Sequence, residues 1–338
     1  MKFNFFKKKN VALVLSSGGP RGFAYIGAIE ELLARGYRIT SVAGASVGSL
    51  IGGVYAAGRL EEFKQWLFSL DSTKIIPLMD FSLSKSYFIK GDKVIDTIKD
   101  IVPNINIEEL KIPYCAIATD LYTGEEIVFR EGKLFDAIRA SISIPSMFRP
   151  VEWEHRVLID GGLANTFPLN RVARKRNDLL VGFNVNAVDT ESINQYLLKR
   201  KAMREELLSL QEEAQGAIGE TLREEKAWTE KVMDAIQMIS DFRQERDKKE
   251  ENERLLNQEA EKANLPTDAE DNYYSILDRS FSIMNHSIAK MNIALNPPDI
   301  LVEMPFDAYS SIPDYGKGKA IAEEGRRLMA EALDRYEK

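Results

Sequence analysis

The sequence predicts an α/β fold in which helices cover a mostly parallel β-sheet. Residues 11–15 form a continuous apolar run, which is typical of a strand buried on both faces, and the short run at residues 39–43 also resembles a strand. Each run ends in small residues and is followed by a segment with helical periodicity. Strands and helices that alternate through short connections favour a parallel sheet, because a helix can return the chain to the start of the next strand.

The same alternation continues to about residue 185 and resumes near the C-terminus. Further strands are expected at residues 112–119, 126–130, 156–159, 179–185 and 300–302. Helices are expected at residues 20–35, from 46 onward, and at 59–70, 92–101, 133–140, 168–176, 272–292 and 318–336. Turn residues at 120–124 favour a hairpin, whereas residues 71–90 show no regular pattern.

Residues 191–264 differ in composition from the rest of the chain. They contain no proline, are dense in Glu, Lys, Arg and Gln, and have apolar residues at three- and four-residue spacing, which predicts one or two long amphipathic helices. We therefore expect a leader at 1–10, a catalytic core at 11–190, a charged helical insertion at 191–264 and the rest of the core domain at 265–338. Two roles of the insertion stay open: a lid or membrane-contacting arm, or a dimerisation or solvated spacer element.

Composition excludes several classes of protein. The net charge of −7 argues against a nucleic-acid-binding protein. A single cysteine, Cys115, cannot form an intrachain disulfide, and one cysteine with two histidines argues against structural zinc. We expect neither a transmembrane helix nor a signal peptide, because the apolar runs are too short, and therefore a cytoplasmic location. Aromatic and lysine residues at 3–9 leave open a solvated leader or peripheral contact with an anionic membrane.

The segment from Gly44 to Gly48 places Ser46 between the second predicted strand and the next helix. A G-x-S-x-G pattern at such a junction is typical of a nucleophile elbow, in which the serine stands on a strained turn and glycines avoid clashes. The hydroxyl would lie at a helix N-terminus, where free amides favour a developing anion. On its own, the pattern fits a tightly packed glycine-rich loop equally well.

The loop after the first strand would lie beside this elbow, at the carboxyl edge of the sheet. Because Pro20 has no N–H, the amides of Gly18 and Gly19 are the expected oxyanion donors, with Val47 as a further candidate. Phosphate binding is the competing interpretation. The loop lacks the Gly-Lys-Ser/Thr ending of a P-loop and the G-x-G-x-x-G spacing of a dinucleotide fold.

The base is less obvious, because the chain has only two histidines. His155 lies in a polar turn-like stretch and His286 in a predicted helix, and neither context suggests a triad. Asp160 ends an apolar strand and precedes two glycines. It could serve as a turn former or cap, or it could accept the Ser46 proton directly. A Ser–Asp dyad would require partial desolvation to raise the pKa of the carboxyl group.

Four stretches, in this order, resemble motifs of the patatin-like phospholipase family. They are SGGPRG at 17–22, GASVG at 44–48, ASISIP at 140–145 and DGG at 160–162. The resemblance covers about residues 11–185 and resumes weakly from 272. It implies a three-layer α/β/α patatin-like fold. Two features depart from the family pattern: Ser17 stands where the family has the first glycine of its oxyanion loop, and the insertion is longer than in a minimal member.

The resemblance also implies a function. A member would be a serine lipid acyl hydrolase that cleaves lipid or phospholipid esters through a Ser46–Asp160 dyad and an acyl-enzyme, with no metal or organic cofactor. Arg21 would position the oxyanion loop or meet a phosphate headgroup. Two alternatives stay open: an acyltransferase with the same dyad, and a non-catalytic lipid-binding scaffold.

Overall fold

The computed structural model describes residues 10–70, 87–89, 92–191, 273–306, 308–309 and 312–338, with a few positions between 193 and 201. The chain divides into two units, Met1–Val188 with Tyr273–Lys338, and Asp189–Asn272. The predicted leader, apart from Asn10, and nearly all of the predicted insertion lie outside the described residues, as do residues 71–86. The elements described below belong to the first unit.

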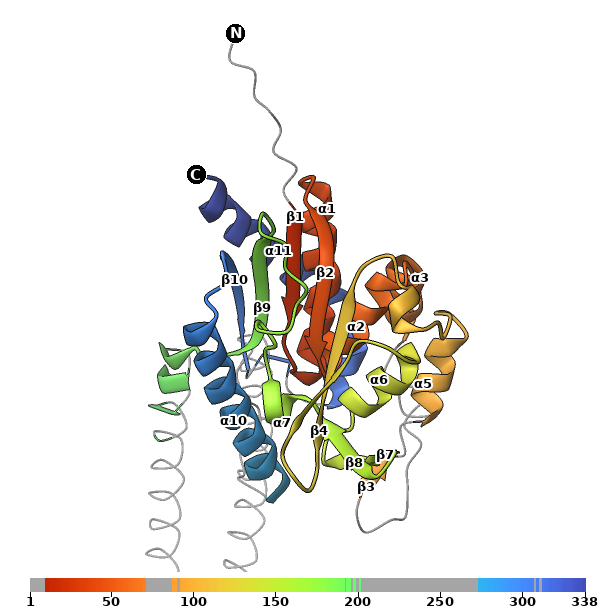
Figure 1. Cartoon of the computed structure of the whole chain (residues 1–338). Helices are drawn as coiled ribbons and strands as arrows, with labels where there is room; N and C mark the ends of the chain where they lie inside the picture. Colours follow the sequence, from red (N-terminus) through yellow and green to blue (C-terminus); the bar gives the residue numbers. More distant parts are fainter. Residues whose placement is uncertain are drawn as a thin grey trace, which may run out of the picture. The chain divides into compact units, whose positions relative to one another are not determined.

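A central eight-stranded sheet has the order β10-β9-β1-β2-β4-β8-β7, with β5 paired to β4 (Figure 1). The strands are β1 Asn10–Leu15, β2 Arg38–Ala45, β4 Tyr114–Asp120, β5 Glu126–Phe129, β7 Val151–Trp153, β8 Arg156–Asp160, β9 Leu179–Ala187 and β10 Ile300–Pro305. The strands from β10 to β4 run parallel, and β5, β7 and β8 are antiparallel to their neighbours. The predicted mostly parallel sheet is therefore confirmed. A separate parallel pair joins β3 Tyr87–Ile89 to β6 Ser146–Phe148.

Helices cover both faces of this sheet, which gives three layers (Figure 1). Alternate side chains of β1 point to opposite faces. Leu13 packs with residues of the helices α1 Ala24–Ala34, α2 Val47–Ala56 and α11 Gly318–Glu337, whereas Val14 packs in a second cluster with Ala289 of α10 Tyr273–Leu295. The other helices are η1 Gly19–Phe23, α3 Leu60–Phe68, α5 Asp92–Lys99, η2 Ile107–Glu109, α6 Leu134–Ser141, α7 Gly162–Asn165 and η3 Ile312–Lys317.

The register of β4 brings two strand ends together. Ala45 at the end of β2 pairs with Ile117, and Asp160 at the end of β8 pairs with the next residue, Ala118. Strand β5 occupies the other edge of β4 over the same residues, so β2 and β8 share one edge. Because β2 is parallel and β8 antiparallel to β4, their carboxyl ends meet head to head. Ser46 and Asp160 are therefore neighbours, although they lie far apart in sequence.

The helix predicted at residues 168–176 is wrong. The segment forms turns, and the short helix α7 precedes it. Contacts with the neighbouring strands explain the difference. The carbonyl oxygen of Arg171 accepts hydrogen bonds from Arg130 and Cys115, and the Arg171 guanidinium pairs with Glu126. These tertiary contacts use the backbone oxygen that a helix would pair with a later amide. The sequence pattern also does not predict the β3–β6 pair.

Helices α1 and α11 pack against each other through two glycines. A Cβ at Gly27 would lie 1.9 Å from the carbonyl oxygen of Ala322, and a Cβ at Gly325 would lie 1.9 Å from that of Ala24. Neither backbone oxygen can move without shifting its helix, so any larger residue separates the pair.

We therefore expect Gly27→Ala to lower the free energy of unfolding by about 2 kcal/mol or more, as measured by urea denaturation. Gly318→Ala is the matched control, because the atoms nearest to its added Cβ belong to the side chain of Leu67, at 3.1 Å, and not to a helix backbone. The control should lose much less stability. Equal stability of wild type and Gly27→Ala would contradict the close helix contact.

Candidate active site

Ser46 stands at the tip of a sharp turn between β2 and α2. Its φ of 53° and ψ of −126° are strained values for a residue with a side chain. The flanking glycines are sterically required: a Cβ at Gly44 would lie 2.3 Å from the carbonyl group of Gly48, and a Cβ at Gly48 would lie 2.3 Å from the carbonyl oxygen of Leu15. The turn therefore has the geometry that the G-x-S-x-G pattern predicts.

The side chains of Ser46 and Asp160 are in direct contact. Ser46 Oγ donates a hydrogen bond to Asp160 Oδ2 at 2.5 Å, and both residues are buried. The other carboxylate oxygen accepts the amide of Gly162 at 2.7 Å. A Cβ at Gly161 would lie 2.0 Å from the carbonyl oxygen of Ile117, so glycine is needed there for the chain to pass so close to β4. Both carboxylate oxygens are thereby fixed in place.

Burial raises the pKa of Asp160 to about 6, and the hydrogen bonds from Ser46 and Gly162 oppose that rise in part. The direction follows from desolvation, since a buried carboxylate loses its hydration. A carboxylate with a higher pKa is a stronger base, and it still ionises near neutral pH. The structure thus gives Asp160 the partly desolvated setting that direct proton acceptance requires.

The stretch at 140–145 holds both residues in position. The amide of Ser46 donates to Ser141 Oγ at 2.9 Å. The carbonyl oxygens of Ser141 and Ser143 accept the amides of Gly161 and Asp160, at 3.2 and 2.9 Å. The motif is recognisable in the sequence, but nothing in its spacing indicates that it forms hydrogen bonds with both Ser46 and the Asp160-Gly161 segment.

The loop before η1 lies beside Ser46. Gly18 and Gly19 have φ values of 153° and 58°, which other residues rarely adopt. The helix predicted at 20–35 is observed as two elements, η1 and α1. Hydrogen bonds tie the loop to its neighbours: the Ser17 amide donates to the carbonyl oxygen of Thr166, just after α7, at 2.9 Å, and Asn186 Nδ2 of β9 donates to the carbonyl oxygen of Ser17 at 2.7 Å. Gly18, Gly19 and Ser46 line the same cavity.

Arg21 is buried, and its guanidinium donates to the carbonyl oxygen of Phe306, just beyond β10. This bond connects the loop to the end of the sheet, which is the contact that a loop-positioning role requires.

The two histidines are not among the residues that line the cavities at Ser46. His155 is exposed in the turn between β7 and β8, and Nδ1 of His286 is 2.8 Å from the carbonyl oxygen of Asn186.

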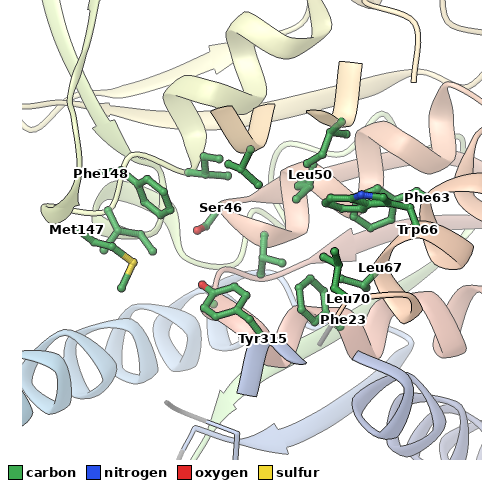
Figure 2. A pocket seen from close by; sticks show the side chains of 16 residues that line it. Phe23, Ser46, Leu50, Phe63, Trp66, Leu67, Leu70, Met147, Phe148 and Tyr315 are labelled. Atoms are coloured by element: carbon green, nitrogen blue, oxygen red, sulfur yellow. The ribbon is translucent and has the colours of Figure 1, made fainter. Parts of the chain in front are cut away.

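Two cavities meet at Ser46. The first, the apolar chamber, has a volume of about 130 Å³. Figure 2 shows Ser46 between Met147 and Phe148 on one side and a group of aromatic and leucine side chains on the other. The apolar lining residues of this chamber are Phe23, Val47, Leu50, Phe63, Trp66, Leu67, Leu70, Val94, Ile98, Ile142, Ile144, Met147 and Phe148.

The second cavity, the polar chamber, has a volume of about 110 Å³. Its polar lining residues are Ser17, Arg21, Ser46, Asp160, Ser282, Asn285 and Tyr315. Gly18 lines this chamber, and Gly19 and Tyr315 line both chambers. Among the described residues, no group of three or more His, Cys, Asp or Glu side chains is arranged to hold a metal ion.

Comparison with known proteins identifies the family. A family model described as patatin-like phospholipase matches residues 13–173, which include Ser46 and Asp160. An uncharacterized NTE family protein of Mycobacterium tuberculosis is 33% identical over 334 residues, covering 97% of this chain and 92% of that protein. The chain belongs to the patatin-like phospholipase family. Two longer relatives, patatin-like phospholipase domain-containing protein 6 of Mus musculus and protein ZK370.4 of Caenorhabditis elegans, are 27% and 31% identical over 55% of this chain and 14% of their own lengths.

Part of the site of this patatin-like protein lies beyond the matched region. Ser282 and Asn285 come from α10, and Tyr315 comes from η3. Sequence analysis missed these three residues and the apolar lining residues outside the quoted motifs, because such side chains carry no motif of their own. Their helical spacing indicates only that they lie on one face of a helix. No helix in the described ranges combines the length and apolar character needed to cross a membrane.

The raised pKa of Asp160 makes stability depend on pH in a defined direction. An acid whose pKa is about 6 when folded and 3.8 ordinarily binds its proton more tightly in the folded state. Its stabilising contribution is therefore complete below pH 3.8 and is lost as the pH rises through about 6.

We expect Asp160→Asn, which mimics the protonated form, to raise the free energy of unfolding at neutral pH by about 1–3 kcal/mol. The gain should disappear as the pH falls towards 3.8. Urea denaturation across this range measures both values. Asp136→Asn, at an exposed position of α6, is the control and should show no such pH-dependent gain. A gain from Asp160→Asn that is the same at every pH would show that burial of charge is not its cause.

Proposed function

We propose that this protein is a serine hydrolase that cleaves carboxylic esters of lipids through a Ser46–Asp160 dyad. Membership of the patatin-like phospholipase family supports lipid acyl hydrolysis as the general activity. The observation that carries the finer proposal is the 2.5 Å hydrogen bond from Ser46 to a buried carboxylate at the meeting point of the two chambers.

The chemistry proceeds in two steps. Asp160 accepts the proton of Ser46 as Oγ attacks the ester carbonyl carbon, and a tetrahedral oxyanion forms. The bond from that carbon to the alcohol oxygen then breaks, and Asp160 passes the proton to the leaving alcohol. In the second step, Asp160 removes a proton from water, which attacks the acyl-serine. The fatty acid leaves, and the proton returns to Ser46.

The oxyanion needs hydrogen-bond donors placed before the reaction begins. We assign this role to the amides of Gly18 and Gly19, with Val47 as a further candidate, because all three residues line the chambers at Ser46. The bonds from Asn186 and Arg21 hold the loop in place before substrate binds. Each such donor typically contributes on the order of 3 kcal/mol to lowering the barrier.

The energetics of the site favour catalysis over a purely structural role. A non-glycine residue with φ of 53° and a buried carboxylate both cost stability. A lipid-binding scaffold has no use for either feature.

The second alternative is an acyltransferase. Water and an added alcohol are equivalent attacking groups in the second step, so analysis of the products formed with an acceptor alcohol separates a hydrolase from an acyltransferase.

Ser46→Ala tests the proposal. We expect it to lower kcat for p-nitrophenyl butyrate by at least about 10⁴-fold and to abolish labelling by a fluorophosphonate probe. The thermal unfolding midpoint reports whether the variant is folded. Ser287→Ala, an exposed position on α10, should keep wild-type turnover and labelling. Near-normal turnover in folded Ser46→Ala would refute the assignment of the nucleophile.

Leu50→Trp tests the apolar chamber as the site of the acyl chain. Leu50 lies one turn after Ser46, and a tryptophan ring there would fill space that a long acyl chain needs. We expect kcat/KM for a dodecanoyl ester to fall about tenfold more than that for an acetyl ester. Leu33→Trp, at an exposed leucine of α1, controls for the added ring. Equal losses for both esters would place the acyl chain elsewhere.

A further inference from the structure

Ser17 contributes a buried hydroxyl group to the polar chamber. The residue is 2% exposed and lines this chamber together with Asp160 and Ser46. In the part of the chain that the structure describes, Ser17 Oγ has no hydrogen-bond partner. A buried hydroxyl group without a partner costs stability, and a small polar molecule bound in the chamber would remove that cost.

The Ser17 hydroxyl and the Asp160 carboxylate lie close together. A Cβ at Gly162 would be 2.7 Å from Ser17 Oγ and 3.0 Å from Asp160 Oδ1. One point is therefore within 3.0 Å of both oxygens, so a single water molecule can bridge them. Any side chain at position 162 would collide with both groups, and glycine keeps the region between them open.

The backbone of Ser17 is held on both sides, so the direction of its side chain is fixed relative to Asp160. Its amide donates to the carbonyl oxygen of Thr166 at 2.9 Å. Its carbonyl oxygen accepts Asn186 Nδ2 at 2.7 Å and the hydroxyl of Ser16 at 2.9 Å. The hydroxyl group is thus preorganised at the chamber wall before any ligand binds.

The second step of the proposed reaction needs a water molecule in a defined orientation. One hydrogen of this water passes to Asp160, and the oxygen must keep a lone pair directed at the acyl carbon. The orientation is defined if the other hydrogen also has an acceptor, and a serine hydroxyl oxygen can accept it. The polar chamber, with a volume of about 110 Å³, has room for water beside these groups.

We propose that Ser17 Oγ positions the water that hydrolyses the acyl-enzyme, by accepting one hydrogen while Asp160 removes the other. The water oxygen bonds to the acyl carbon, the bond from that carbon to Ser46 Oγ breaks, and Asp160 returns the proton to Ser46. This inference rests on the proposed function. It concerns the residue at which the oxyanion loop departs from the family pattern, which has glycine there.

The proposal makes water a better attacking group than an alcohol. An alcohol has a single O–H hydrogen, which it gives to Asp160, so it has none left for Ser17. Loss of the Ser17 hydroxyl should therefore slow attack by water and leave attack by an alcohol unchanged. An oxyanion donor or a purely structural residue would affect both reactions alike.

The test compares wild type with Ser17→Ala, which keeps the Cβ and removes only the hydroxyl. With p-nitrophenyl butyrate and a fixed concentration of methanol, we expect the ratio of methyl butyrate to butyric acid to rise about tenfold, as for loss of one hydrogen bond. Both products come from the same acyl-serine, so acylation does not affect their ratio.

A second measurement follows the butyryl-enzyme by intact-protein mass after rapid acid quenching. Without methanol, the butyryl group should leave Ser17→Ala about tenfold more slowly than wild type. The value of kcat/KM for p-nitrophenyl butyrate, which reports acylation, should stay near that of wild type.

Ser41→Ala is the matched control. Ser41 Oγ is likewise buried without a partner in the described part of the chain, but Ser41 lies in β2 and lines neither chamber. Its loss should leave the product ratio and the decay of the butyryl-enzyme unchanged. The thermal unfolding midpoint of each variant reports whether it is folded.

The outcomes separate the inference from the proposed function. If wild type forms butyric acid but Ser17→Ala keeps the wild-type product ratio, or loses kcat/KM to the same extent as deacylation, the inference is overturned and the proposed hydrolysis stands. If wild type forms no butyric acid and is not labelled at Ser46 by a fluorophosphonate probe, both fail together.

Discussion

The site depends on the hydrogen bonding of one strand, β4. Its edge continues from β2 to β8 without a gap, because Ile117 pairs with the last residue of β2 and Ala118 with the last residue of β8. A one-residue slip of either strand would turn Ser46 or Asp160 toward the opposite face of the sheet. The close passage of Gly161 over Ile117 fixes the register further, since no side chain fits between them.

The site also concentrates unfavourable energy, which the rest of the domain must offset. A strained serine, a buried carboxylate and two left-handed glycines lie within one small region. Around it, the core is continuous from β1 through α1 and α2 to α11, and the glycine contact between α1 and α11 allows the two helices to approach closely. The fold can therefore hold Ser46 and Asp160 in a geometry that an isolated segment would not adopt.

Sequence reasoning reached those parts of the site that depend on short-range chemistry. The glycines around Ser46 and the Asp160-Gly161-Gly162 turn are local steric requirements, so their patterns can be read without knowing the fold. The mostly parallel sheet follows in the same way from buried apolar runs. The failed helix at 168–176 shows the limit, because the contacts of Arg171 with distant strands override local propensity. The residues of the chamber walls are harder still to predict from the sequence, because Asn285 lines the site only once α10 has packed in place.

The two ends of the chain contribute different things to one cavity. The groups that would perform the reaction lie between residues 13 and 173, and the polar wall opposite them is built largely after residue 273. Two relatives can therefore share all four motifs and still differ in the lining of this cavity. A comparison restricted to the motif region covers only one side of it, because residues of α10 and η3 line the other side.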